Sequence, residues 1–138
     1  MRPLPSSRRA LLPLCCLLLF ASCEGDEPSV ALDVTAVALG GGEVAINLYN
    51  DGETAGVVHG CESGPMTAVS RWEGSDFVYW GTLNSGCPAH QFRDYALERY
   101  EELEYVVSLP SGRYRFTVQF IVEGRFGEGS SRSNPVDV

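Results

Sequence analysis

Both histidines of the 138-residue chain lie beside a cysteine: His59 two residues before Cys61, and His90 three residues after Cys87. Two cysteines and two histidines form a ligand set that Zn²⁺ binds in tetrahedral geometry. The same cysteines could instead join in a disulfide, which needs an oxidising compartment. The choice between these two chemistries therefore depends on where the protein works, and that is encoded in the N-terminal segment.

The N-terminal segment has the three parts of an export signal. Residues 1–9 contain three arginines and no acid, residues 10–20 are apolar apart from Pro13, and Ala21 and Ser22 are small, as a signal peptidase requires. A membrane-spanning helix needs about 20 apolar residues, and this stretch offers about a dozen. We therefore expect an exported protein.

The end of this segment carries a more specific motif. Phe20-Ala21-Ser22-Cys23 resembles the lipobox of bacterial lipoproteins, although that family prefers Leu where this chain has Phe20. The resemblance implies cleavage before Cys23, acylation of its sulfur, and attachment to the membrane of the cell envelope through this lipid. A plain secretory signal is the alternative. Because Glu24 follows Cys23, rather than the aspartate associated with inner-membrane retention, we expect the outer membrane.

The predicted organisation is a signal peptide (1–22), a short polar tether (23–29) and one domain (30–138). Removing the signal takes three of the ten basic residues and none of the eighteen acidic ones, so the net charge changes from −8 to −11. This charge repels phosphate and anionic lipid headgroups. We therefore expect no nucleic-acid partner.

The fate of each cysteine follows from this organisation. Cys15 and Cys16 leave with the signal and Cys23 carries the lipid, so Cys61 and Cys87 remain and are predicted to form a structural disulfide. The alternative is an exported metal-binding domain in which a zinc ion is held by His59, Cys61, Cys87 and His90. A copper site is a further alternative, for which Met66 is the one methionine left.

The rest of the chain has the pattern of a β-protein. Apolar and polar residues alternate in short segments separated by turn residues such as Gly40-Gly41-Gly42 and Asn50-Asp51-Gly52. The predicted strands are "VALDVTAVAL", "EVAINLYN", "AGVVH", "MTAVSRW", "DFVYW", "RYRFTVQFIV" and "SRSNPVDV". About seven strands in about 110 residues predict an all-β sandwich. Only residues 89–105 have helical character.

A further resemblance supports this fold class. "LPSGRY" (109–114) resembles the entry to a sandwich strand in immunoglobulin-like domains, with one residue less than the commonest spacing. The order of cysteines, Arg71-Trp72, this motif and "SNP" is similar to small bacterial immunoglobulin-like lipoprotein domains, including those related to an intracellular proteinase inhibitor of bacilli. The resemblance implies an immunoglobulin-like β-sandwich with a hydrogen-bonded Tyr114, and proteinase inhibition as an alternative function.

The predicted function is non-catalytic. The chain offers no Ser-His-Asp arrangement and no glycine-rich phosphate loop, so we expect neither an enzyme nor a cofactor. Trp72, Tyr79 and Trp80 lie on a predicted hairpin, where at least one should belong to the core and the others could stack on a sugar or a protein. The sequence thus predicts a lipid-anchored binding or structural module with an unknown protein or glycan partner.

Overall fold

The fold is described from a computed structural model, which covers residues 31–122 and 128–138. These residues form eleven strands and one short 3₁₀ helix. In chain order they are β1 (Leu32–Gly40), β2 (Glu43–Asn50), β3 (Gly56–Cys61), β4 (Gly64–Pro65), β5 (Thr67–Trp72), β6 (Phe77–Leu83), η1 (Ala89–Gln91), β7 (Phe92–Leu97), β8 (Glu102–Ser108), β9 (Arg113–Val122), β10 (Glu128–Arg132) and β11 (Val136–Asp137).

The smaller of the two sheets, sheet A, is antiparallel with the order β1-β2-β8. The turn between β1 and β2 uses Gly40, Gly41 and Gly42, all at positive φ, a backbone region that side chains with a Cβ rarely adopt. Along β2, alternate residues are fully buried, as the sequence pattern predicted. Their outward neighbours are polar or small, so this sheet buries one face.

The larger sheet, sheet B, is built around β9. This strand pairs with β5 and the start of β3 on one side, and with β10 and β11 on the other. β6 is an edge strand that pairs with β5, while β7 and β4 pair with β3. The long alternating segment predicted from "RYRFTVQFIV" is therefore the central strand, and β5 and β10 of the site described below pair with it directly.

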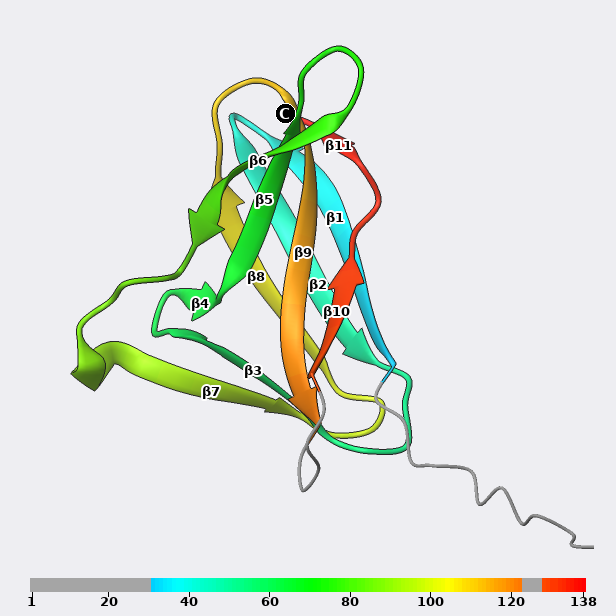
Figure 1. The fold of residues 1–138 in the computed structure, drawn as a ribbon, viewed down its shortest axis with the longest axis vertical. Coiled ribbons are helices and arrows are strands. Elements are labelled where there is room, and N and C mark those ends of the chain that lie inside the picture. Colours follow the sequence, from blue (N-terminus) through cyan, green and yellow to red (C-terminus); the bar gives the residue numbers. More distant parts are fainter. Residues whose placement is uncertain (1–30, 123–127) are drawn as a thin grey trace, which may run out of the picture.

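The two sheets pack face to face, which confirms the predicted all-β sandwich (Figure 1). Buried apolar side chains from both sheets form one core: Leu32, Val34, Ala36, Val44, Ile46, Leu48, Val58, Val69, Leu97, Tyr105, Leu109, Tyr114, Phe116, Val118, Phe120 and Val136. Tyr114 is fully buried, and its hydroxyl donates a hydrogen bond of 2.9 Å to the carbonyl of Pro110, four residues earlier. This is the tyrosine contact that the resemblance to immunoglobulin-like domains implied.

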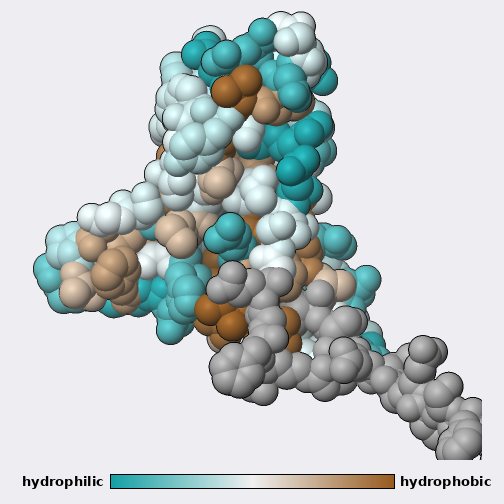
Figure 2. All heavy atoms as spheres, in the orientation of Figure 1, coloured by the Kyte–Doolittle hydropathy of each residue, from teal (hydrophilic) through white to brown (hydrophobic). Residues whose placement is uncertain are grey.

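Part of sheet B projects from the sandwich as an arm formed by β3, η1 and β7, at the left of Figures 1 and 2. β3 pairs with β9 only at Gly56 and Val57, then continues away from it while pairing with β7 over its whole length. β3 ends at Cys61, which the Cys61–Cys87 disulfide joins to the segment between β6 and η1. The disulfide therefore lies at the far end of the arm.

The helical interpretation of residues 89–105 is wrong. Only Ala89–Gln91 forms a short 3₁₀ turn, and the rest forms β7 and β8, joined by a turn in which Tyr100 has a φ of +67°. Pairing of β7 with β3 and of β8 with β2 outweighs the weak helical spacing of the aromatic residues. These two strands, the short β4 and the division of the last predicted strand into β10 and β11 raise the count from the predicted seven to eleven. Pro135 lies between β10 and β11 rather than within a strand.

Candidate functional site

The cysteine and histidine cluster forms a disulfide in the structure. Cys61 and Cys87 are bonded to each other, so neither sulfur is a thiolate that could bind a metal. The ring of His59 faces Asp94 on the neighbouring β7, with 2.5 Å between Nδ1 and Oδ1, and His90 is exposed on η1. Within residues 31–122 and 128–138, no group of three or more His, Cys, Asp or Glu side chains is placed to hold a metal ion.

The outward side of sheet B brings together side chains from four strands. Thr82 on β6 pairs with Ala68 on β5, which pairs in turn with Thr117 on β9. On its other side, Thr117 pairs with Arg132 on β10. Because directly paired residues project from the same side of a sheet, these four side chains form one row. We call the outward side chains of β5, β6, β9 and β10 the sheet B face.

A second row lies next to the first, toward the β5–β6 turn. Tyr79 on β6 pairs with Ser70, although a register shift between Val69 and Ser70 adds one residue to β6. Ser70 pairs on its other side with Arg115 on β9. Such a bulge strengthens the local twist and re-aims side chains. As a result Tyr79 leans along its own strand, and its hydroxyl forms a hydrogen bond of 2.8 Å with the hydroxyl of Thr82.

A hollow of about 290 Å³, which we call the face hollow, lies beside the first row, with Tyr79 of the second row in its wall. Its lining is uncharged and comes from β5, β6, β9 and the residue before β5: Met66, Ala68, Tyr79, Thr82, Thr117 and Gln119. Ligand pockets typically enclose about 300 to 1,000 Å³. The face hollow is at the small end of that range, a size suited to a single ring or a short side chain.

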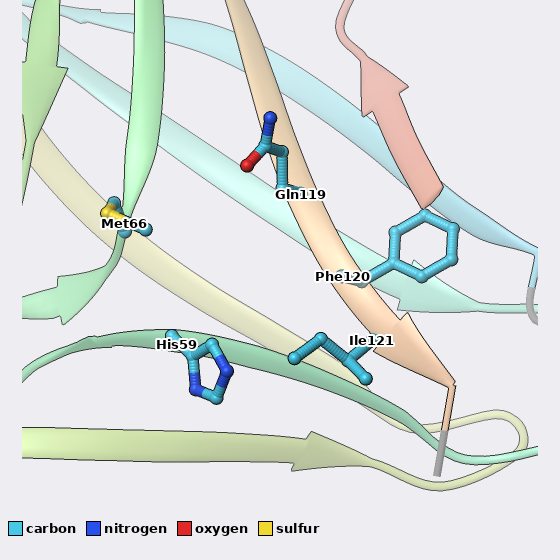
Figure 3. A pocket seen from close by; sticks show the side chains of 5 residues that line it. All are labelled: His59, Met66, Gln119, Phe120 and Ile121. Carbon is cyan, nitrogen blue, oxygen red and sulfur yellow. The ribbon is translucent and has the colours of Figure 1, made fainter. Parts of the chain in front are cut away.

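A smaller hollow of about 70 Å³ adjoins the face hollow where β3 diverges from β9 (Figure 3). It is lined by His59, Met66, Gln119, Phe120 and Ile121, and two of these, Met66 and Gln119, also line the face hollow. The concave surface thus continues from β6 along β9 to the base of the arm. The hydrogen-bonded pair of His59 and Asp94 stands at its far end.

Aromatic rings extend the sheet B face toward the β5–β6 turn. Trp72 and Phe77 are paired across the hairpin with their ring centroids 5.2 Å apart. The guanidinium of Arg115 lies 4.2 Å from the centroid of the Phe77 ring, in a cation–π contact. Within the described residues, its buried Nε has no hydrogen-bond partner. In Figure 2 the upper part of the molecule, which holds β5 and β6, shows pale spheres of intermediate hydropathy with some hydrophobic and hydrophilic spheres among them.

Charge is distributed unequally between the two sheets. Sheet A carries four acidic residues and no arginine: Asp33, Glu43, Glu102 and Glu104. The strands β5, β6, β9 and β10 carry four arginines and one acid: Arg71, Arg113, Arg115, Arg132 and Glu128. Arg71 pairs with the buried Tyr114 and so lies on the other side of the sheet, which leaves three arginines on the sheet B face. A chain with a net charge of −8 therefore presents a face with a local excess of positive charge.

Two of the face arginines are not neutralised by a neighbour. Arg113 lies 3.8 Å from a carboxylate oxygen of Asp137, and Arg71 donates a hydrogen bond to the carbonyl of Ser111. Among the side chains that the structure describes, Arg115 and Arg132 form no ion pair with an acid. The face can therefore offer two guanidinium groups, an exposed tyrosine ring and several neutral polar groups to a ligand.

The hairpin aromatics predicted from the sequence are all exposed. Trp72, Tyr79 and Trp80 retain 40%, 66% and 43% of their accessible surface, so the expectation that one of them belongs to the core is wrong. Trp80 is the residue added by the bulge, and it packs edge-on against Tyr114 while keeping one side open. The alternation of apolar and polar residues along β9 is enough to predict that Thr117 and Arg115 point outward. It does not predict which residues of β5 and β6 lie beside them, because that depends on the order of strands in the sheet.

The predicted lipid-attachment residue, Cys23, and the whole signal segment lie outside the described residues. Within the described ones, no helix is both long and apolar enough to cross a membrane. No protein-family model matches the chain, and no curated protein matches its sequence. The residues and geometry of the molecule itself therefore carry the functional argument.

Proposed function

We propose that the protein is a lipid-anchored, non-catalytic binding module of the bacterial cell envelope, whose binding surface is the sheet B face. The observation that carries the proposal is the face hollow, a concave and uncharged site lined by the exposed Tyr79. Near it on the same face lie Arg115 and Arg132, which form no ion pair among the described side chains. Exposed aromatic residues and arginines are the side chains most enriched where proteins bind partners. The hydroxyl and amide side chains that line the face hollow would orient a bound ligand through hydrogen bonds rather than transfer protons to it.

The position of the face in the fold supports this proposal. β1 begins at Leu32 at the bottom of the view in Figure 1, and the β5–β6 turn lies at the top. The nine residues of β1 span about 30 Å. A lipid on Cys23 would hold the lower end near the membrane, since the six tether residues that follow it, 24–29, reach only about 20 Å. The upper half of the face would then point toward other envelope components.

The membrane attachment is tested by intact mass of the native protein purified from membranes. We expect the mass of residues 23–138 with added acyl groups, and we expect Cys23→Ala to move the protein from the membrane fraction to the soluble fraction. A native mass without acyl groups would show that the lipid assignment is wrong. This experiment is independent of what the sheet B face binds.

The binding surface is tested by photocrosslinking in cells. A benzophenone amino acid at position 70 replaces Ser70 at the centre of the sheet B face, and a control chain carries it at position 35, replacing the exposed Thr35 on sheet A. We expect adducts of higher mass from position 70 alone, and their loss when Tyr79→Ala is added. Equal adducts from both positions, or none from position 70, would contradict the proposal.

A further inference from the structure

The polar groups of the face hollow suit a ligand rich in hydroxyl groups. The hydroxyls of Thr82 and Thr117 and the amide of Gln119 can each both donate and accept hydrogen bonds. A sugar hydroxyl also donates and accepts hydrogen bonds, so these side chains can form a hydrogen bond with it in either orientation of its proton. A ligand with only acceptors or only donors would leave part of this lining unpaired, at a cost in affinity.

The apolar groups of the same hollow suit the other side of a sugar ring. The Tyr79 ring, 66% exposed, stands next to Ala68 and Met66, so C–H and aromatic surface lies beside the polar groups. The bond between Tyr79 and Thr82 fixes the ring before any ligand arrives, which reduces the entropy lost on binding. A pyranose ring is amphipathic in the same way, with C–H groups on its faces and hydroxyls around its rim.

The two arginines add a requirement for negative charge. Arg132 is the direct cross-strand neighbour of Thr117, and Arg115 is two residues from Thr117 on the same side of β9, about 7 Å along the strand. Neither arginine lines the face hollow itself, but both are neighbours of Thr117, which does. A guanidinium binds a carboxylate, phosphate or sulfate through two parallel hydrogen bonds, and neither arginine is paired with an acid among the described side chains.

We infer that the sheet B face binds an acidic saccharide, with one sugar ring in the face hollow against Tyr79 and an anionic substituent on Arg115 or Arg132. The inference rests on the proposed function, since it names the ligand of that binding surface. A folded acidic protein fits less well, because a flat protein surface would leave the concave face hollow unfilled. An acidic peptide is distinguished by the experiment below.

The test measures binding of the full detergent-solubilised protein to four immobilised polymers. Two of them are acidic polysaccharides: polygalacturonate, which carries carboxylates, and heparin, which carries sulfates as well. The methyl ester of polygalacturonate is an uncharged control with the same sugar, and polyglutamate is an acidic peptide without sugar. We expect binding to at least one acidic polysaccharide and at least about tenfold weaker binding to the methyl ester. Polyglutamate should bind at least about tenfold more weakly than that polysaccharide.

Variants separate ring stacking from charge. Tyr79→Ala and Arg115→Gln should each weaken binding about tenfold, whereas Tyr79→Phe, which keeps the ring, should stay within about threefold of the parent. Arg99→Gln is the charge-matched control, because Arg99 lies in the β7–β8 turn against Tyr100. If Arg115→Gln lowers the melting temperature, the exposed Arg132→Gln provides the same test.

Two results would overturn the inference. The first is that the protein binds neither acidic polysaccharide. The second is that it binds polyglutamate as tightly as the polysaccharide and that Tyr79→Ala does not weaken this binding, since negative charge alone would then explain the affinity. If crosslinks from position 70 still form and depend on Tyr79, the face remains a binding surface and only its ligand is wrong. If those crosslinks are absent as well, the proposed function itself fails.

Discussion

The disulfide between Cys61 and Cys87 allows a quantitative prediction, because the structure shows what it joins. Cys61 is buried at the end of β3 on the arm, and Cys87 lies between β6 and η1. The loop between them contains β4, β5 and β6, so the bond connects the two ends of the hairpin that forms half of the sheet B face. We consider the replacement of both cysteines by alanine.

The expected cost follows from the length of the closed loop. For a sequence separation of 26 residues, the chain-entropy model gives about 12 cal/mol/K of entropy removed from the unfolded chain, or about 3.5 kcal/mol at 25 °C. A small domain is stable by about 5 to 15 kcal/mol, so this is a large share. In a domain of about 100 residues, such a loss lowers the melting temperature by about 15 °C.

The assay is thermal unfolding followed by circular dichroism, with and without reductant. We expect the parent in reductant to melt close to the double variant Cys61→Ala/Cys87→Ala, and reductant to leave that variant unchanged. Alanine at position 61 avoids placing an unpaired hydroxyl in the core, which would add a separate cost. Adding a chelator to the parent should change nothing, since a disulfide binds no metal.

Two outcomes would refute this reasoning. If the double variant melts within about 3 °C of the unreduced parent, the bond does not constrain the unfolded chain as the model assumes. If a chelator lowers the melting temperature of the parent, the four residues His59, Cys61, Cys87 and His90 hold a metal, and the structural disulfide is wrong. Titration of free thiols on the unreduced protein gives an independent answer, with none expected from this pair.

Three further predictions concern polar side chains that the fold buries or hydrogen-bonds. Tyr114→Phe removes the hydrogen bond to Pro110 and should cost about 1 kcal/mol, or roughly 5 °C in melting temperature. Burial raises the pKa of Tyr105 to about 12 from 10.0, so the unfolded chain loses this proton first as the pH rises. Stability should therefore fall by about 2 to 3 kcal/mol between pH 10 and 12 in denaturant titrations, and this component should be absent in Tyr105→Phe. The amide of Asn134 bonds both the N–H and the carbonyl of Ala36 at 3.0 Å, so Asn134→Ala should cost about 1 to 3 kcal/mol and speed amide exchange at the edge of β1.

The fold class could be predicted from the sequence because local patterns dictate it. Val44, Ile46 and Leu48 alternate with polar or small residues, and all three are fully buried in the structure. Three glycines mark the β1–β2 turn. The same local reasoning failed for β7 and β8, whose aromatic spacing is compatible with a helix. Their strand conformation comes from pairing with β3 and β2, which is information that a single segment does not contain.

The candidate site could be predicted only in part. Pairing of Cys61 with Cys87 followed from counting the cysteines that remain after export, and the structure contains that bond. The sheet B face could not be assembled from the sequence, since Tyr79 and Arg115 are 36 residues apart and become neighbours only through Ser70 on the strand between them. The bulge that brings Trp80 to the edge, and so leaves all three hairpin aromatics exposed, also has no sequence signal of its own.

The disulfide and the sheet B face depend on each other through β6. Within the part of the chain that the structure describes, this strand is hydrogen-bonded to a neighbouring strand on one side, so its position rests on β5 and on its two ends. Just past its last residue, the side chain of Asn84 bonds the carbonyl of Pro65 at 3.0 Å and the hydroxyl of Ser63 at 2.7 Å, and Cys87 then fixes the chain to the arm. Reduction should therefore loosen Tyr79 and the wall of the face hollow at temperatures well below global unfolding. Ligand binding should weaken there while the far-ultraviolet spectrum is unchanged, and unaltered affinity after reduction would show that β5 alone holds the site.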